Sequence, residues 1–172
     1  MKKLLLIIAV VLFSYNVTAQ DTDDSTSNAL SKGSWVIEAN TGSWATGNTA
    51  FSLISIDGST LWSIGFEGGY FFMDNFAIKA GLGYTDADLG DGVFTYKIGG
   101  KYYAAGQIPL GVDFTGTSVD GESASWIGLQ GGYAWFVADN ISIEPTLRYN
   151  LTLDEEKAES AFQALIGFAF HF

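Results

Sequence analysis

Residues 60–84 have the sequence TLWSIGFEGGYFFMDNFAIKAGLGY, in which bulky apolar residues alternate with small or polar ones on both sides of Asp74-Asn75. Every second residue from Trp62 to Phe72 is apolar or glycine, and Phe71 is the one bulky residue at the positions between them. The same alternation continues after the Asp-Asn pair. A period of two is typical of a strand with two different faces and not of a helix. The segment therefore predicts two strands joined by a short turn.

The same pattern recurs along the rest of the chain. Besides 60–72 and 76–84, alternating segments occur at 34–41, 94–102, 108–115, 127–135, 141–149 and 162–172. Most have about the 9–11 residues that a tilted strand needs to cross a bilayer. We therefore predict an all-β fold, an eight-stranded antiparallel up-and-down transmembrane β-barrel, over residues 33–172.

The connections between these segments alternate in length. Short turns at 73–75, 104–107 and 137–140 alternate with longer polar loops at 42–59, 85–92, 116–124 and 152–160. Short turns at one rim and long loops at the other are typical of outer-membrane barrels. The β-prone stretch Ala50–Ile56 falls in the first long loop. Because bacterial barrels usually have an even number of strands, we expect it to extend a strand above the membrane, although the sequence leaves its place in the wall open.

The volume of the side chains decides which face of the predicted barrel points outward. A soluble ligand-binding barrel shows the same alternation with reversed polarity. The interior of eight strands has room only for side chains that fill it, and the bulky set would overfill that space. We therefore expect the bulky face to point outward into lipid. Aromatic residues cluster near both ends of the segments, as expected for two interfacial girdles.

The N-terminus has the three parts of a secretory signal peptide. Met1-Lys2-Lys3 is basic, Leu4–Phe13 is an unbroken apolar run, and Val17-Thr18-Ala19 is a small-residue cleavage site. The apolar run is too short to cross a bilayer as a helix. We therefore predict a signal peptide over residues 1–19, followed by a flexible acidic periplasmic tail over residues 20–32.

Composition excludes several classes of function. The chain of 172 residues has no cysteine and one histidine, His171, so disulfides and Cys-based or multi-His metal centres are excluded. The formal net charge of −11 has the wrong sign for a nucleic-acid-binding protein. We predict no metal site, no cofactor and no nucleic-acid partner.

Charged residues on the inward face balance to zero. Four acids face four bases, and buried charges must pair because their desolvation costs several kcal/mol each. The sequence therefore predicts a structural salt-bridge network that plugs the lumen, since a polar conduit needs a wider barrel than eight strands form. The predicted members are Glu38, Glu67, Lys79, Lys97, Lys101, Asp113, Glu144 and Arg148.

Three motifs resemble the small eight-stranded outer membrane protein β-barrel domain family, akin to OmpA-type and OmpX-type barrels. They are GYFFMDNFAI at 69–78, the second turn Asp139-Asn140, and the ending FAFHF at 168–172. The resemblance implies the outer membrane of a Gram-negative cell, contact with membrane lipid and lipopolysaccharide, and recognition of Phe168, Phe170 and Phe172 by the outer-membrane assembly machinery. We expect a monomer. The resemblance is specific for architecture and says little about activity.

The candidate functions fall into four classes. We expect a non-enzymatic integral barrel with a structural or surface-interaction role. The alternative is an adhesion or ligand-binding barrel that acts through its first long loop, where Trp44, Phe51, Leu53, Ile54 and Ile56 would be exposed. A soluble ligand-binding barrel and a lipid-modifying enzyme are less favoured.

The lipid-modifying enzyme would pair His171 with a serine for acyl transfer. This histidine lies at the short-turn rim, and nothing in the sequence supplies the other members of a triad. We therefore predict no catalytic residue. The long loops are acidic, and 86–92 is similar to a calcium loop without its closing Glu, so weak bridging of divalent cations to lipopolysaccharide phosphates stays open.

Overall fold

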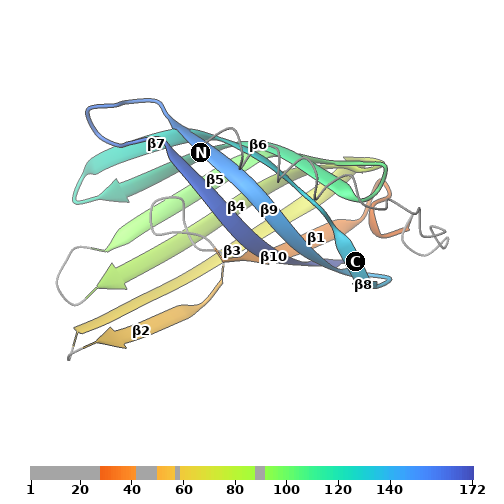
Figure 1. Ribbon diagram of the computed structural model, residues 1–172, viewed down its shortest axis with the longest axis horizontal. Helices are drawn as coiled ribbons and strands as arrows, with labels where there is room; N and C mark the ends of the chain where they lie inside the picture. Colours follow the sequence, from red (N-terminus) through yellow and green to blue (C-terminus); the bar gives the residue numbers. More distant parts are fainter. Residues whose placement is uncertain (1–27, 42–49, 57–58, 88–91) are drawn as a thin grey trace, which may run out of the picture.

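The computed structural model describes residues 28–41, 50–56, 59–87 and 92–172, which form a barrel of antiparallel strands (Figure 1). Within this part of the chain no helix is both long enough and apolar enough to cross a membrane. The strands are β1 (Trp35–Asn40), β2 (Ser52–Ile56), β3 (Ser59–Met73), β4 (Phe76–Ala87), β5 (Val93–Ala104), β6 (Ile108–Val119), β7 (Glu122–Gly132), β8 (Trp135–Ala138), β9 (Ile141–Thr152) and β10 (Ala161–His171).

Two pairs of these strands each form one strand of the barrel wall. β1 and β2 pair antiparallel with β3, at Trp35↔Tyr70 and Ser52↔Ser63, so β2 continues the wall strand that β1 begins. The stretch Ala50–Ile56 therefore lengthens the first wall strand and does not add a ninth.

β7 and β8 likewise share one neighbour, β9, and keep one register with it as far as Phe136. Trp126 of β7 pairs with Thr152 of β9, and Trp135 of β8 pairs with Ile143 of β9. The ten strands therefore make eight wall strands. The pairing of β1 with β10 closes the sheet, and the predicted eight-stranded antiparallel barrel is confirmed.

Short turns lie together at one end of the barrel, here called the short-turn end. They connect β3 to β4 at Asp74-Asn75, β5 to β6 at 105–107, and β8 to β9 at Asp139-Asn140. Asn75 has a φ of 63°, in the left-handed region that Asn tolerates better than most residues. All three turns fall within the ranges that the alternation predicts.

The opposite end, here called the long-loop end, contains more strand than the sequence predicts. The predicted loop over 116–124 is wrong, because β6 and β7 continue through it to a two-residue turn at Asp120-Gly121. The φ values of 49° and 85° and the Asp-Gly sequence are those of a type I′ hairpin. These strand ends are small and polar on both faces, so they lack alternation although their backbones pair.

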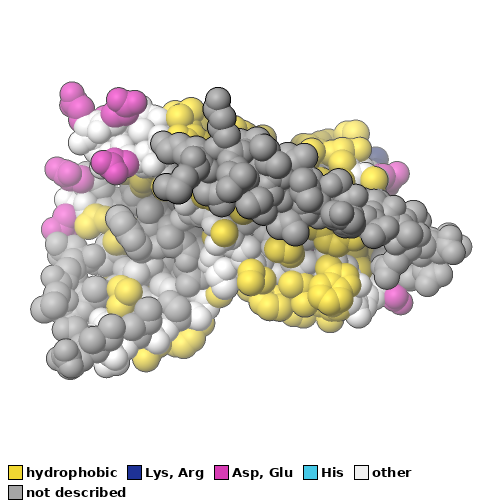
Figure 2. All heavy atoms as spheres, viewed as in Figure 1, with side chains coloured by type: hydrophobic (Ala, Val, Ile, Leu, Met, Phe, Trp, Pro, Cys, Tyr) yellow, Lys and Arg dark blue, Asp and Glu magenta, His cyan; other side chains and the backbone are white. Residues whose placement is uncertain are grey.

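The outward face is apolar and the inward face is small or polar. Leu82 and Leu147 on the outward face are 58% and 48% exposed, whereas Glu67, Lys79 and Arg148 on the inward face are buried. Apolar side chains show on the barrel surface between its two ends (Figure 2). The predicted orientation of the two faces is therefore confirmed.

Residues 28–34 cover the short-turn end. Leu30 is buried, and its carbonyl accepts a hydrogen bond of 2.7 Å from the Asn75 N–H. The Lys32 N–H donates to Asp74 Oδ1 at 2.8 Å. The expectation of a flexible tail up to Lys32 is therefore wrong for residues 28–32, because Leu30 supplies an apolar side chain that the barrel end can bury. The predicted signal peptide and residues 20–27 lie outside the described residues.

The lumen and its ends as candidate functional site

A cluster of charged side chains crosses the middle of the lumen. Glu38 on β1 contacts both Lys79 on β4 and Lys101 on β5, the latter at 2.8 Å between Oε1 and Nζ. Lys79 Nζ also lies 2.7 Å from Glu67 Oε1. Lys101 reaches across the barrel to Glu144 on β9. Side chains from five wall strands therefore meet in one continuous chain of ion pairs.

Register explains why this cluster needs its lysines. Glu38 and Glu67 are directly opposite each other on paired strands, an arrangement of like charges that destabilises a sheet. Lys79 contacts both carboxylates and neutralises the repulsion between them. Lys97 adds a longer contact to Glu67, at 3.4 Å.

A second cluster is centred on Arg148 of β9. Its guanidinium binds both carboxylate oxygens of Asp113 on β6, at 2.5 and 2.6 Å. The same group donates to Gln130 at 3.1 Å and to Thr115 at 3.2 Å, and Nε donates to Asn150 at 2.7 Å. A bidentate Arg–carboxylate pair with its remaining donors satisfied is the arrangement that best compensates burial of the charges.

Glycine makes room for this cluster. A Cβ on Gly128 would collide with the guanidinium of Arg148, and a Cβ on Gly99 would collide with Asp113. The guanidinium therefore lies over a wall position that has no side chain.

All eight residues predicted for the lumen point into it, and each takes part in an ion pair. Among the described residues no ion pair joins Arg148–Asp113 to the other six, so there are two clusters and not one network. The sequence leaves the partner of Arg148 open among Glu67, Asp113 and Glu144, and the register selects Asp113. The eight residues are Glu38, Glu67, Lys79, Lys97, Lys101, Asp113, Glu144 and Arg148.

An aromatic cluster that the sequence analysis missed closes the short-turn end. Phe71 and Tyr103 are fully buried, with ring centroids 6.0 Å apart, and His171 packs against both. Phe136 lies 5.5 Å from the His171 ring. The Tyr103 hydroxyl donates to Glu144 at 2.9 Å, and this hydrogen bond connects the aromatic cluster to the ion pairs around Lys101. The signal was Phe71, the one bulky residue that breaks the alternation of its segment.

His171 also lies near a serine, but the pair is not arranged as a nucleophile and its base. Nε2 is 3.4 Å from the Ser142 hydroxyl, which donates instead to Glu144 at 2.8 Å. Both side chains are almost completely buried, at 1% and 0% exposure. A substrate therefore has no access to the hydroxyl in this arrangement.

The C-terminal strand carries the three phenylalanines predicted as an assembly signal. Phe168, Phe170 and Phe172 are exposed on the outward side of the chain end. Phe172 exchanges two backbone hydrogen bonds with Trp35, of 2.7 and 2.9 Å. The chain end is thus fastened to β1, and the recognition of these residues by the assembly machinery stays a prediction.

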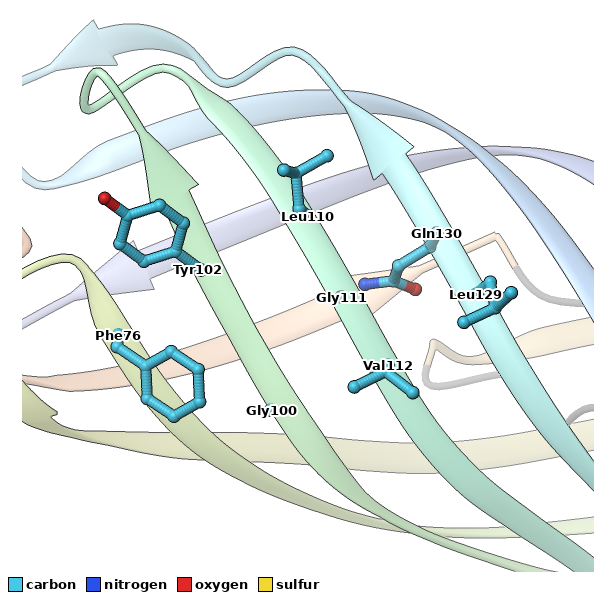
Figure 3. Close-up of a pocket in the computed structure, with 8 residues that line it drawn as sticks. All are labelled: Phe76, Gly100, Tyr102, Leu110, Gly111, Val112, Leu129 and Gln130. Atoms are coloured by element: carbon cyan, nitrogen blue, oxygen red, sulfur yellow. The ribbon is translucent and has the colours of Figure 1, made fainter.

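The outer wall has a groove of about 470 Å³ over Gly100. Phe76, Tyr102, Leu110 and Val112 lie around it (Figure 3). A Cβ on Gly100 would lie 2.9 Å from Cζ of Phe76, so the ring occupies the space that a side chain would take. The groove is open outward and is part of the apolar face.

The residues of the alternative adhesion hypothesis are only partly described. Phe51 and Leu53 are exposed, at 68% and 59%. Trp44 and the side chains of Ile54 and Ile56 lie outside the described residues, as does most of the calcium-like stretch 86–92.

No protein-family model and no curated protein sequence matches this chain. Among solved structures, the N-terminal β-barrel domain of Pseudomonas aeruginosa OprF is similar, with a TM-score of 0.53 and 14% sequence identity. The match covers 82% of this chain and 98% of that domain. The chain has the fold of a small outer-membrane barrel.

A weaker likeness extends to the Yersinia pestis outer membrane protein Ail in a phospholipid bilayer nanodisc. Its TM-score is 0.45 at 10% identity, covering 82% of this chain and 100% of Ail. At these identities the fold is what is shared, and the role of this chain has to be argued from its own residues.

Proposed function

We propose that this protein is a non-enzymatic integral barrel of the bacterial outer membrane, closed to ions, with a structural and surface-interaction role. The observation that carries the proposal is the combination of an outward apolar face with a lumen filled by paired charges. Only lipid makes such an outer face stable, and an eight-stranded lumen filled in this way leaves no water channel.

The closure of the lumen rests on three successive layers. Arg148 and Asp113 form the first, toward the long-loop end, and the cluster around Lys101 forms the second. Phe71 and Tyr103 form the third at the short-turn end, where Leu30 covers them. An ion would have to displace a desolvated ion pair and an aromatic cluster to pass.

The sequence motifs supply the rest of the proposal. A signal peptide over 1–19 would deliver the chain to the periplasm, and the assembly machinery would insert it through Phe172. The short-turn end would then face the periplasm and the acidic long-loop end the outside. The partners are membrane lipid and lipopolysaccharide, and the barrel acts as a monomer.

Single-channel conductance in a planar bilayer tests the closed lumen. The unaltered protein, purified in its folded form, should give no steady conductance steps. Steady, porin-sized conductance would overturn the closed-lumen proposal and favour transport. Density-gradient fractionation of the producing cells tests location independently, with a variant lacking 1–19 as the control that should not leave the cytoplasm.

Adhesion through the first long loop is a second candidate. It is favoured by the exposure of Phe51 and Leu53 at the long-loop end, where β2 reaches beyond β1. Cells producing a Phe51→Ser, Leu53→Ser double variant should then adhere less to a surface than cells producing the unaltered protein at equal levels. Equal adhesion would exclude these two side chains as the contact.

A further inference from the structure

A pocket of about 610 Å³ opens at the long-loop end, between the β6–β7 hairpin and the loop that joins β9 to β10. Trp126 lies on its inner side and is 5% exposed. Thr117, Val119 and Ala124 line one wall, and residues 157–161 line the other. This volume lies within the range of about 300–1,000 Å³ that is usual for ligand-binding pockets.

Hydrogen bonds hold the two walls of this pocket in place. The Trp126 indole N–H donates to the carbonyl oxygen of Glu159 at 3.1 Å. The Thr152 N–H donates to the Ser160 hydroxyl at 3.1 Å, and the Leu153 N–H donates to the Ser125 carbonyl at 3.0 Å. A pocket whose loop is already fastened loses little conformational entropy when a ligand enters.

One wall is an open strand edge. Pairing between β7 and β9 ends at Trp126, while β7 continues along β6 to Glu122. The Ser125 carbonyl points toward β9, so by the alternation of an antiparallel strand the Ser123 N–H and C=O point to that side too. Within the described part of the chain, no strand pairs with Ser123 on that side. An extended peptide can add to such an edge.

The surroundings of the pocket are acidic. Glu122 and Glu159 line it, and Lys157 is the one basic residue among the described residues of these two segments. That lysine is already near Asp154, at 3.6 Å. Acidic side chains stand out at this end of the molecule, over the hairpin and the neighbouring loop (Figure 2). The charge therefore favours a cationic ligand.

We propose that this pocket binds a short, extended, cationic peptide from outside the cell. The peptide backbone pairs with Ser123, one apolar side chain sits between Ala124 and Trp126, and its Lys or Arg side chains face Glu122 and Glu159. The inference deepens the proposed surface-interaction role and rests on it only for the exposure of this end to the outside.

The probe is acetyl-Lys-Ser-Leu-Ser-Lys-amide carrying a fluorescent label, in which the leucine and both lysines lie on one face of the extended peptide, as Glu122, Ala124 and Trp126 do on β7. It is titrated with the full barrel in zwitterionic nanodiscs, and binding is followed by anisotropy. We expect saturable one-to-one binding that is absent from empty nanodiscs. The charge-reversed peptide, with Glu in place of each Lys, should not bind. A peptide N-methylated at both serines, which loses the backbone donors that could pair with Ser123, should bind about 3–10-fold more weakly.

Two charge-neutralising double variants locate the site. Glu122→Gln with Glu159→Gln should weaken binding about 3–10-fold, because two exposed ion pairs are lost. Glu155→Gln with Glu156→Gln removes the same amount of charge from the β9–β10 loop, outside the pocket, and is the matched control, expected to change affinity less than about twofold. Ala124→Phe, which fills the pocket, should abolish binding, with folding checked by circular dichroism.

Each failure has a distinct meaning. No saturable binding, or equal binding of the charge-reversed peptide, overturns the proposal. Equal weakening by the two double variants shows a general charge effect and overturns the pocket as the site. Because the titration uses purified protein in nanodiscs, none of these results changes the conductance or the cell fractionation that test the proposed function.

Discussion

Arg148 is one of the largest fully buried side chains among the described residues, and its environment shows how a buried charge is tolerated in the lumen. Its contacts to Asp113, Thr115, Gln130 and Asn150 compensate the loss of water around the guanidinium. Single and double substitutions therefore differ in their effect on stability. Removing one member of a buried ion pair leaves the other charged and without a partner, whereas removing both charges does not.

We therefore expect Arg148→Ala to lower the free energy of unfolding by about 3–5 kcal/mol. Arg148→Met combined with Asp113→Asn should recover much of that loss, because no lone charge stays buried. Urea titration of the barrel in lipid vesicles measures both variants. A double variant as unstable as the single one would contradict the account of a stranded charge.

A substitution at Gly128 tests whether the guanidinium of Arg148 needs the space that this residue leaves free. Gly128→Ala places a methyl group against Arg148 and should cost about 1–3 kcal/mol, as overpacking usually does. Gly131→Ala on the same strand is the matched control, because its added Cβ would meet only Leu110 Cδ2 at 3.5 Å. Equal effects on the urea midpoint would show that strand propensity, and not the contact with Arg148, decides the cost.

At the scale of the element, a wall strand has two chemically opposite faces. In β4, Leu82 is exposed outward and Lys79 is buried inward, three residues apart. A shift of one residue in the pairing of this strand would place the lysine in lipid and the leucine among the ion pairs. Register is therefore specified strongly across the middle of the barrel.

Leu82→Arg should cost about 2–4 kcal/mol in a bilayer, because it places a charge near the middle of the lipid-facing side. Leu82→Ala, which removes the side chain without adding charge, is the control and should cost much less. The measurement is again the free energy of unfolding in vesicles. Unchanged stability of the arginine variant would contradict the outward orientation of this face.

At the scale of the whole molecule, closure depends on the short β1 strand, which pairs with both β10 and β3. Phe172 extends the β1–β10 pairing at the short-turn end through its two backbone hydrogen bonds with Trp35. Its side chain is 67% exposed and adds little to packing within the barrel. Any large effect of that side chain in cells would therefore come from insertion and not from the stability of the finished barrel.

Phe172→Ala keeps both backbone hydrogen bonds and removes only the ring. We expect refolding in detergent to stay nearly intact and the amount of protein in the outer membrane to fall sharply. Immunoblots of fractionated cells measure the amount, with Phe162→Ala, on the outward face at the other end of the same strand, as control. Normal membrane levels of Phe172→Ala would remove the assembly-signal hypothesis.

The sequence by itself determined the features that depend on neighbours along the chain. Side chains in a strand alternate between two faces whatever their partners are. The pattern around Trp62 and Leu82 was therefore enough to predict the wall strands, their outward and inward faces and the eight lumen charges. The short turn at Asp74-Asn75 is local in the same sense, because its conformation depends on the residues that form it.

Only the tertiary structure decided which distant residues meet. Asp113 became the partner of Arg148 through the register of β6, β7 and β9, which alternation alone leaves open. The strand ends around Asp120-Gly121 have no periodic sequence pattern, because backbone pairing stabilises them. The turn at Leu30 has none either, because it depends on one buried side chain. The pocket at Trp126 forms only where the β6–β7 hairpin and the β9–β10 loop lie side by side. Contacts of this kind join positions far apart in the chain, and their geometry exists only once the barrel has closed.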